Sequence, residues 1–364
     1  MKNYSNTRAT FAIAKASFRS IIRSPSAVVF SLAFPLIFIT VFANIGESAV
    51  AVDVGVAKSC DTSNMVYRIL KTVKVLHLVT NETDAELAEK FKKANVDVIL
   101  DIRKNTAKMP PYTVNVKYTK ASQQKGNLFR SVLNSIIYQL NSSGNTAPPT
   151  VANVQETTQT GRVSKYIDFI LPGMLGFSLL SSGVFGTAFV FLSLRITLVL
   201  KRFFATPVKK YSIVLGEGMA RLVFSWLGAL FIIAVGHYAF GFTLVHGFVT
   251  VVNMLILSAI GLIIFMGFGF IISGIAKNES TIPPLSNIVT LPQFLLSGTF
   301  FATSAFPKWL QSLSGALPLT HLNNAMRRIA FEGVGLGDIS HELLILGIWF
   351  IIIYAVAVKT FKWE

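Results

Sequence analysis

Charged residues are scarce in this chain. Asp, Glu, Lys and Arg make up 14% of its 364 residues, compared with roughly 25% in an average soluble protein. The deficit indicates that much of the protein surface does not face water. The charges that are present lie mainly in residues 1–25, 58–130 and 195–221, and the stretches between have almost none. This pattern excludes an ordinary soluble globular chain.

Acidic residues are scarcer than basic ones, with 17 Asp and Glu against 33 Lys and Arg and a net charge of +16. Nucleic acid, an acidic protein or an anionic membrane face could each explain such a charge. The basic residues do not gather on one soluble domain with aromatic platforms, which argues against nucleic acid. Their distribution fits membrane topology instead.

Cysteines and enzyme motifs are also lacking. Cys60 is the only cysteine, so neither an intrachain disulfide nor a cysteine cluster for a metal is possible. The chain contains no GxxxxGK[ST], HExxH, GxSxG or CxxC pattern. We therefore expect no catalytic residues, no metal site and no cofactor bound by this chain.

Long apolar runs are the main feature of the sequence. A helix needs about 20 mostly apolar residues to cross a membrane. Six stretches approach this length, and the fifth is short and contains Pro292. They are Ala27–Ile45, Phe169–Leu194, Leu222–Phe242, Phe248–Ile275, Leu285–Ala302 and Leu343–Val358. The sequence predicts an α-helical polytopic membrane protein with six spans: an amphipathic N-terminal helix at 1–25, a retained first span at 26–45, and five spans within 166–364.

Lys and Arg predict the orientation, because short cytoplasmic segments are enriched in them. If the N-terminus is cytoplasmic and six spans alternate, the cytoplasmic segments are 1–25, 195–221, 276–283 and 359–364. These carry 14 Lys and Arg against three acids, whereas the outer turn at 237–247 has no Lys or Arg. We therefore expect a multi-pass protein of the cell membrane with both termini in the cytoplasm.

Residues 46–165 predict a small, water-soluble α/β domain inserted outside the cytoplasm between the first two spans. Expected strands are Val50–Val56, Val73–Val79, Val96–Ile102 and Tyr112–Tyr118, and expected helices are Ser63–Leu70, Glu82–Lys93 and Gly126–Leu140. Residues 141–162 are rich in Ser, Thr, Asn, Gln and Pro, which predicts a flexible tether.

The loop at 195–210 has one apolar side and one basic side, which predicts a short amphipathic helix that ends at Pro207. It could be an anchor on lipid headgroups or a docking element for a cytoplasmic partner, and the residues alone slightly favour the anchor. The candidate residues are Arg195, Lys201, Arg202, Phe203, Phe204, Thr206 and Pro207.

Charges inside the spans are almost absent, which argues against a transporter driven by an ion gradient. Glu217 and Arg221, four residues apart at the start of the third span, suit an interfacial ion pair on one helix face. After the fifth span, residues 303–333 predict two short helices separated by Pro318. They are too polar to span and too apolar for a free loop, so we expect them to dip into the outer leaflet.

Four stretches of the chain resemble the permease subunits of type-2 ABC exporters. The first is the basic N-terminal helix followed by Arg23-Ser24-Pro25 and a span that contains proline. The second is Ile170-Leu171-Pro172-Gly173. The third is Arg202–Val208 with Leu215-Gly216-Glu217. The fourth runs through Ser297–Phe301, Phe306–Leu310, Leu317–Thr320 and the Asn324–Arg328 helix.

The resemblance implies a dimer with a second permease copy, identical or different, and two copies of an ABC ATPase subunit that bind ATP and Mg. It also implies that 195–207 is a coupling helix for the ATPase, with the N-terminal helix, carrying Arg19 and Arg23, as a second contact. Relatives usually carry an acid upstream of the Thr-Pro, which this chain lacks, so either the contact would use other charges or the partner would be a divergent one. Residues 303–333 would form a re-entrant outer gate.

The function implied is export of an amphiphilic substrate, powered by the partner's ATP hydrolysis. Candidate pathway or gate residues are Asn287, Gln293, Phe300, Phe301, Pro318 and Asn324. The alternative is a membrane scaffold or receptor that transports nothing and binds a ligand through its outer domain.

Overall fold

The computed structural model describes residues 5–24, 29–45, 52–73, 75–80, 82–92, 95–105, 110–119, 123–142, 152–159 and 165–361. The chain divides into two compact units. Unit 1 comprises Met1–Ile45 and Tyr166–Glu364, and unit 2 comprises Gly46–Lys165. This division coincides with the domain that the sequence predicts to be inserted at 46–165.

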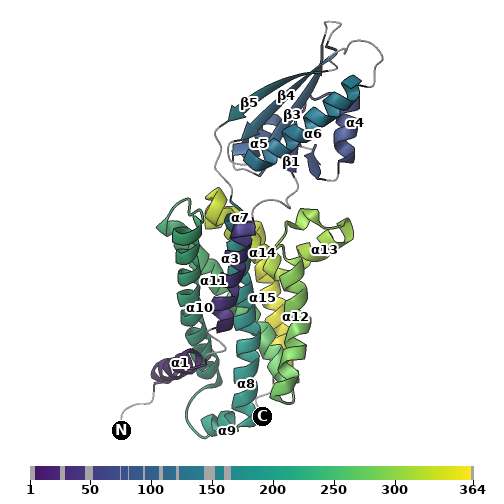
Figure 1. The fold of residues 1–364 in the computed structure, drawn as a ribbon. Helices are drawn as coiled ribbons and strands as arrows, with labels where there is room; N and C mark the ends of the chain where they lie inside the picture. The colour runs from purple at the N-terminus through teal and green to yellow at the C-terminus, as the bar shows by residue number, and fades with distance from the viewer. Residues whose placement is uncertain are drawn as a thin grey trace. The chain divides into compact units, whose positions relative to one another are not determined.

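Unit 2 is a five-stranded mixed sheet with the strand order β2-β1-β3-β4-β5. β1 pairs in parallel with β2 and β3, β4 is antiparallel to β3, and β5 is parallel to β4. Helices α4 and α6 pack their apolar residues on one face of the sheet (Figure 1). The elements are β1 (Val52–Val56), α4 (Met65–Thr72), β2 (Leu76–Val79), α5 (Asp84–Lys92), β3 (Val98–Lys104), β4 (Tyr112–Thr119), α6 (Gln123–Ser142) and β5 (Ala152–Gln159).

Strand β5 corrects part of the predicted tether at 141–162. Its backbone pairs with β4 along its whole length, from Tyr112 opposite Ala152 to Thr119 opposite Gln159. Val154 is half-buried against the core of unit 2, whereas Gln155 and Thr157 are exposed. Two apolar residues at the start of the strand, Ala152 and Val154, give too little alternation for a sequence signal, so the prediction of a flexible tether is wrong for 152–159. Residues 143–151 and 160–162 of the tether lie outside the described residues.

Unit 1 is a helical bundle. One continuous helix of 31 residues, Tyr166–Ile196, is built from α7 (Tyr166–Ser181), the π-helix η3 (Ser182–Gly186) and α8 (Thr187–Ile196). The other elements are α1 (Asn6–Ile22), η1 (Val29–Ala33), α3 (Phe34–Ile45), α9 (Val199–Phe204), α10 (Lys210–Phe240), α11 (Phe248–Ile275), η4 (Glu279–Thr281), α12 (Ile282–Leu296), η5 (Thr303–Ala305), α13 (Lys308–Ala316), α14 (Pro318–Arg327), η6 (Arg328–Glu332), η7 (Leu336–Ile339) and α15 (Ser340–Thr360).

In the described part of the chain, four helices are long and apolar enough to span a membrane: Tyr166–Ile196, Lys210–Phe240, Phe248–Ile275 and Leu336–Thr360. The helices at the first and fifth predicted spans are shorter. The apolar helix at the first is Ser31–Phe42, and α12 has 15 residues. A 15-residue helix rises about 22 Å, less than the hydrocarbon core of about 30 Å. Helix α12 ends before Gly298, whose φ of 70° is left-handed, so six spans remain a prediction.

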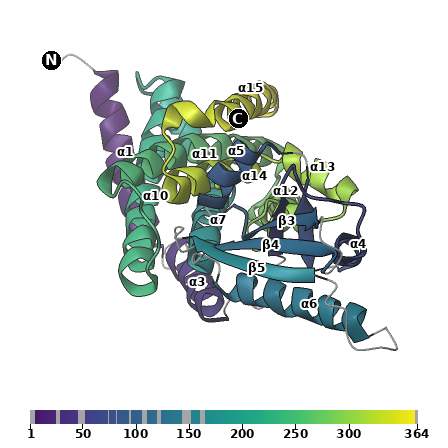
Figure 2. The same ribbon diagram turned by 90° about the horizontal axis from the view of Figure 1, so that it is seen from above.

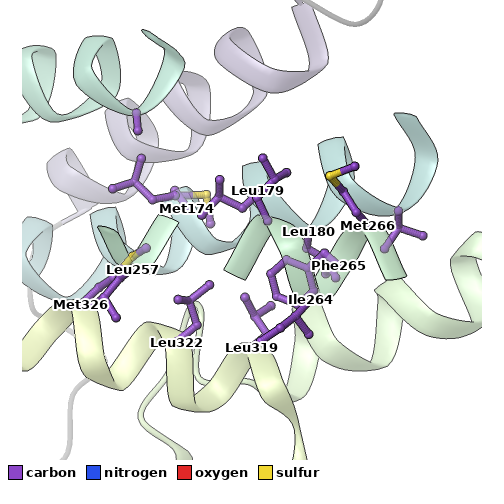
Figure 3. Close-up of a cluster of buried hydrophobic side chains, with 14 of the residues drawn as sticks. Met174, Leu179, Leu180, Leu257, Ile264, Phe265, Met266, Leu319, Leu322 and Met326 are labelled. Carbon is purple, nitrogen blue, oxygen red and sulfur yellow. The ribbon is translucent and has the colours of Figure 1, made fainter. Parts of the chain in front are cut away.

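Helix α11 lies among α7, α10, α14 and α15 (Figure 2). The α7–η3 segment, α11 and α14 enclose the core shown in Figure 3, where Met174, Leu180, Phe265 and Leu322 are each no more than 1% exposed. Small residues allow this close packing, because a Cβ on Gly183 would lie 2.6 Å from the Cβ of Phe265.

Helix α1 lies crosswise against α10 at the edge of the bundle (Figures 1 and 2). It packs on the first turns of α10, where a Cβ on Gly216 would lie 2.8 Å from Ile13 and 3.0 Å from the Thr10 carbonyl oxygen. Phe11 is 63% exposed. The N-terminal segment therefore forms a helix that is fixed to the bundle through α10. Its predicted place on the membrane surface stays a prediction.

Candidate functional site

The predicted docking loop forms the short helix α9 between α8 and α10. Leu198 adopts a left-handed φ of 61°, which turns the chain between α8 and α9. Leu200 is buried, whereas Lys201 and Arg202 are exposed and Phe203 is half-buried. A helix forms over Val199–Phe204 within the predicted stretch, with both cations on its exposed side. Its role as an anchor or docking element stays a prediction.

The remaining residues predicted for docking differ in their surroundings. Arg195 lies in the last turn of α8. Its Nη2 donates to the Ala276 carbonyl oxygen at 2.6 Å, which ties α8 to the end of α11. Thr206 and Pro207 are exposed. The side chain of Phe204 lies outside the described residues. The structure therefore gives Arg195 a contact inside the bundle, and a docking role for it stays a prediction.

Glu217 and Arg221 form the predicted ion pair, at 2.8 Å, but they are 3% and 4% exposed. Arg221 also donates to the carbonyl oxygens of Ser182 at 3.2 Å and Gly186 at 2.5 Å. These carbonyls belong to η3, and a π-helical turn disturbs the regular α-helical hydrogen bonds and can free acceptors. The predicted pair is therefore buried among the helices, and through Arg221 it joins α10 to the α7–α8 helix. Its position at the membrane interface stays a prediction.

Gly186 makes this contact possible, because a Cβ there would lie 1.8 Å from Nη1 of Arg221. The i, i+4 spacing of Glu217 and Arg221 predicts the pair itself. Its carbonyl acceptors lie 35 and 39 residues away in the sequence, and no local pattern reveals them.

The two arginines of the N-terminal site are exposed. Arg19 lies in the last turn of α1, and Arg23 is the residue that caps it. Both face away from the packed side of the helix and remain candidates for contact with lipid or with a partner.

The segment Ser297–Phe300, which follows α12, is held by α7 and α14. Asn323 of α14 is fully buried, and its Nδ2 donates to the Ser297 carbonyl oxygen and to the Thr299 hydroxyl oxygen, each at 3.3 Å. The hydroxyl of Tyr166, at the start of α7, donates to the Phe300 carbonyl oxygen at 2.6 Å. These bonds fix the backbone that links the end of α12 to the two helices.

Arg327 completes this arrangement. Its Nε donates to the Phe169 carbonyl oxygen at 2.9 Å, its Nη2 donates to the Gly298 carbonyl oxygen at 2.5 Å, and its Cζ lies 3.8 Å from the centroid of the Phe169 ring. One cation therefore joins α14, α7 and the segment after α12.

A continuous run of rings lies beside this segment, and we call it the aromatic strip. Phe34, Phe38 and Phe42 recur every four residues along α3 and therefore share one face. Centroid distances of 4.8 Å from Phe34 to Phe177 and 5.5 Å from Phe42 to Phe300 connect this face to α7 and to the segment after α12. The strip comprises Phe34, Phe38, Phe42, Tyr166, Phe177, Phe294 and Phe300.

The predicted gate residues are only partly brought together. Phe300 lies in the aromatic strip, and the Asn324 side-chain oxygen accepts from Arg327 at 3.4 Å. Pro318 is buried as the first residue of α14. Phe301 is 55% exposed, beside Phe300.

The other two predicted gate residues, Gln293 and Asn287, lie on different sides of α12. Gln293 is 3% exposed, and its Oε1 has no hydrogen-bond partner among the described residues. Asn287 is exposed. Both remain predictions as pathway residues.

The predicted pair of outer helices exists as α13 and α14, and the two differ in burial. Helix α14 packs against α7, α11 and α15, whereas Trp309 of α13 is 72% exposed. Asn323 and Arg327 are absent from the predicted site residues. The signal that could have identified Arg327 is a cation in a helix that otherwise packs apolar residues.

No three His, Cys, Asp or Glu side chains among the described residues lie close enough to hold a metal ion. The architecture, with long apolar helices, a short helix packed crosswise on one of them and an inserted α/β domain, defines a multi-pass membrane protein. The sequence model of the ABC-2 family transporter proteins matches residues 25–359. The chain belongs to this family, and its predicted resemblance to type-2 ABC permeases is confirmed.

Two relatives illustrate the similarity. The ABC transporter G family member 20 of Dictyostelium discoideum is 26% identical over 370 residues, which cover 95% of this chain and 50% of the relative. The inner membrane transport permease YadH of Escherichia coli is 24% identical over 202 residues, which cover 55% of this chain and 74% of the relative. The chain thus spans half the length of the Dictyostelium protein.

Proposed function

We propose that this chain is the membrane-spanning permease subunit of an ATP-driven exporter. A separate ABC ATPase would bind ATP and Mg, and the permease would move an amphiphilic substrate out of the cytoplasm. The family match over residues 25–359 supports a transport role, and the permease YadH is a relative that bears such a name. Residues 1–364 contain no phosphate-binding loop, so in this proposal ATP binds outside them.

In this proposal α3 and α12 complete six spans, and both termini are cytoplasmic. Unit 2 then lies outside the cytoplasm, and α9 lies on the cytoplasmic side with α1. Two permease copies would pair, and the substrate path would run between them along α7 and α12. The segment Ser297–Phe300 with α14 would close its outer end.

The observation that carries the proposal is that α9 is exposed, whereas the helices on either side of it, α8 and α10, are anchored in the bundle. Lys201 and Arg202 are exposed on α9, where a partner can reach them. The adjoining helices are tied to the bundle by polar contacts, from Arg195 to the Ala276 carbonyl oxygen and from Arg221 to the carbonyl oxygens of Ser182 and Gly186. A displacement of α9 by an ATPase would therefore move α8 and α10 rather than only the loop.

Co-purification with candidate ABC ATPases tests this proposal. We expect the double reversal Lys201→Glu and Arg202→Glu to abolish stable assembly and ATP-dependent transport, because both charges at the contact change sign. Lys308→Glu, an exposed cation on α13, is the matched control and should assemble normally. Normal assembly and transport by the double variant would contradict the docking role of α9.

A further inference from the structure

Arg327 has no negatively charged partner. A guanidinium has five N–H donors, and three of Arg327's have acceptors among the described residues: two backbone carbonyls and the side-chain oxygen of Asn324. No carboxylate of the described residues forms an ion pair with it. The residue is half-buried, so part of it remains accessible.

Two other arginines of unit 1 have carboxylate partners. Arg328, the next residue, lies 2.9 Å from Glu342 and 3.8 Å from Glu332, and Arg221 pairs with Glu217. A cation held in a membrane bundle without a counter-charge is costly, and such residues mark binding sites and pathways more often than structural positions. The uncompensated charge of Arg327 therefore points to an anionic ligand.

The aromatic strip begins beside this cation. Phe169, under the guanidinium, lies 6.1 Å from Tyr166, which lies 6.3 Å from Phe42. Six of the seven residues of the strip are half-buried, and the seventh, Phe294, is 9% exposed. The strip thus presents an accessible apolar surface that leads away from a single positive charge.

We propose that Arg327 and the aromatic strip form the binding site for an amphiphile with an anionic head group, a phosphate or a carboxylate. The head group takes the free N–H donors of Arg327, and the apolar body lies along Phe42, Phe38 and Phe34. This assignment rests on the proposed export function and gives the charge and polarity of its substrate.

The test uses the full chain in phosphatidylcholine nanodiscs and three probes: dodecyl phosphate, dodecyltrimethylammonium and inorganic phosphate. Dodecyl phosphate should bind at least about 10-fold more tightly than the ammonium of equal chain length, since hydrogen bonds to a charged group contribute that much or more. Inorganic phosphate should bind more weakly than dodecyl phosphate, because it has no apolar body for the strip.

Variants test whether Arg327 causes the preference for dodecyl phosphate over dodecyltrimethylammonium. Arg327→Gln should abolish it, Arg327→Lys should keep most of it, and Lys308→Gln, an exposed cation on α13, should leave it unchanged. Phe38→Ala should weaken both alkyl probes by a similar factor. Competition from phosphatidic acid in the nanodisc would identify a membrane lipid as the source of the head group, and its absence would assign the site to a smaller amphiphile.

Equal binding of the two alkyl probes to the wild-type chain, which requires no variant, would overturn the proposal. So would an undiminished preference in folded Arg327→Gln. Since neither measurement involves an ATPase, a negative result would leave the export proposal to its own assembly test.

Discussion

Gly186→Ala is the change that tests the buried polar link between α10 and the α7–α8 helix most specifically. The added Cβ would lie 1.8 Å from Nη1 of Arg221, so the guanidinium must leave the Ser182 and Gly186 carbonyls. Each hydrogen bond to a charged group contributes about 1.5–3 kcal/mol. Alanine recovers up to about 1 kcal/mol, because it favours helix more than glycine does.

The net loss should therefore be about 2–5 kcal/mol, which corresponds to a fall in Tm of about 4–20 °C for a unit of this size. Thermal unfolding of the purified chain in detergent measures it. Gly347→Ala is the matched control, since that glycine is exposed in α15 and its Cβ would meet nothing within 4 Å. If Gly186→Ala and Gly347→Ala unfold at the same temperature, the role of Arg221 as the link between α10 and the α7–α8 helix is refuted.

Two further predictions concern unit 2. Phe129→Ala removes a ring that is 0% exposed in the core of unit 2 and should lower the stability of that unit by about 3–5 kcal/mol, measured as faster proteolysis within residues 46–165. Tyr138→Ala, at a side chain that is 75% exposed, should be cleaved at the wild-type rate. Equal cleavage of the two variants would contradict the packing of Phe129. Burial raises the pKa of the Cys60 thiol above its usual 9.0, so its thiolate forms only at higher pH. At pH 8 Cys60 should therefore be alkylated more slowly than the exposed thiol of Asn134→Cys in a Cys60→Ala chain. The alkylation rate of Cys60 should still be rising beyond pH 9. A plateau for Cys60 at lower pH than for the exposed thiol would contradict this.

The sequence predicts those parts of the fold that depend on local periodicity. The alternation of Val52, Val54 and Val56 predicts β1, and the long apolar runs predict the four longest helices of unit 1. It fails where the chain's structure depends on a distant partner. Strand β5 is stabilised mainly by its backbone pairing with β4, and its polar residues resemble those of a linker.

The candidate site divides in the same way. The exposed cations of α9 follow from the amphipathic pattern of the loop, and the spacing of Glu217 and Arg221 predicts their pairing. The burial of that pair depends on Gly186 and on the carbonyls of η3, which no local pattern connects to α10. Likewise, the Asn324–Arg328 helix is visible in the sequence, but the contacts of Arg327 with Phe169 and Gly298 require the folded bundle.

Cysteine accessibility in intact cells tests the central claim, that α9 lies on the side of the membrane where ATP is available. In a Cys60→Ala chain, Lys201→Cys and Asn134→Cys place single thiols at exposed positions of α9 and α6. A membrane-impermeant maleimide should label Asn134→Cys in intact cells and Lys201→Cys only after permeabilisation. Labelling of Lys201→Cys from outside would contradict the account, because no ATPase could then contact α9.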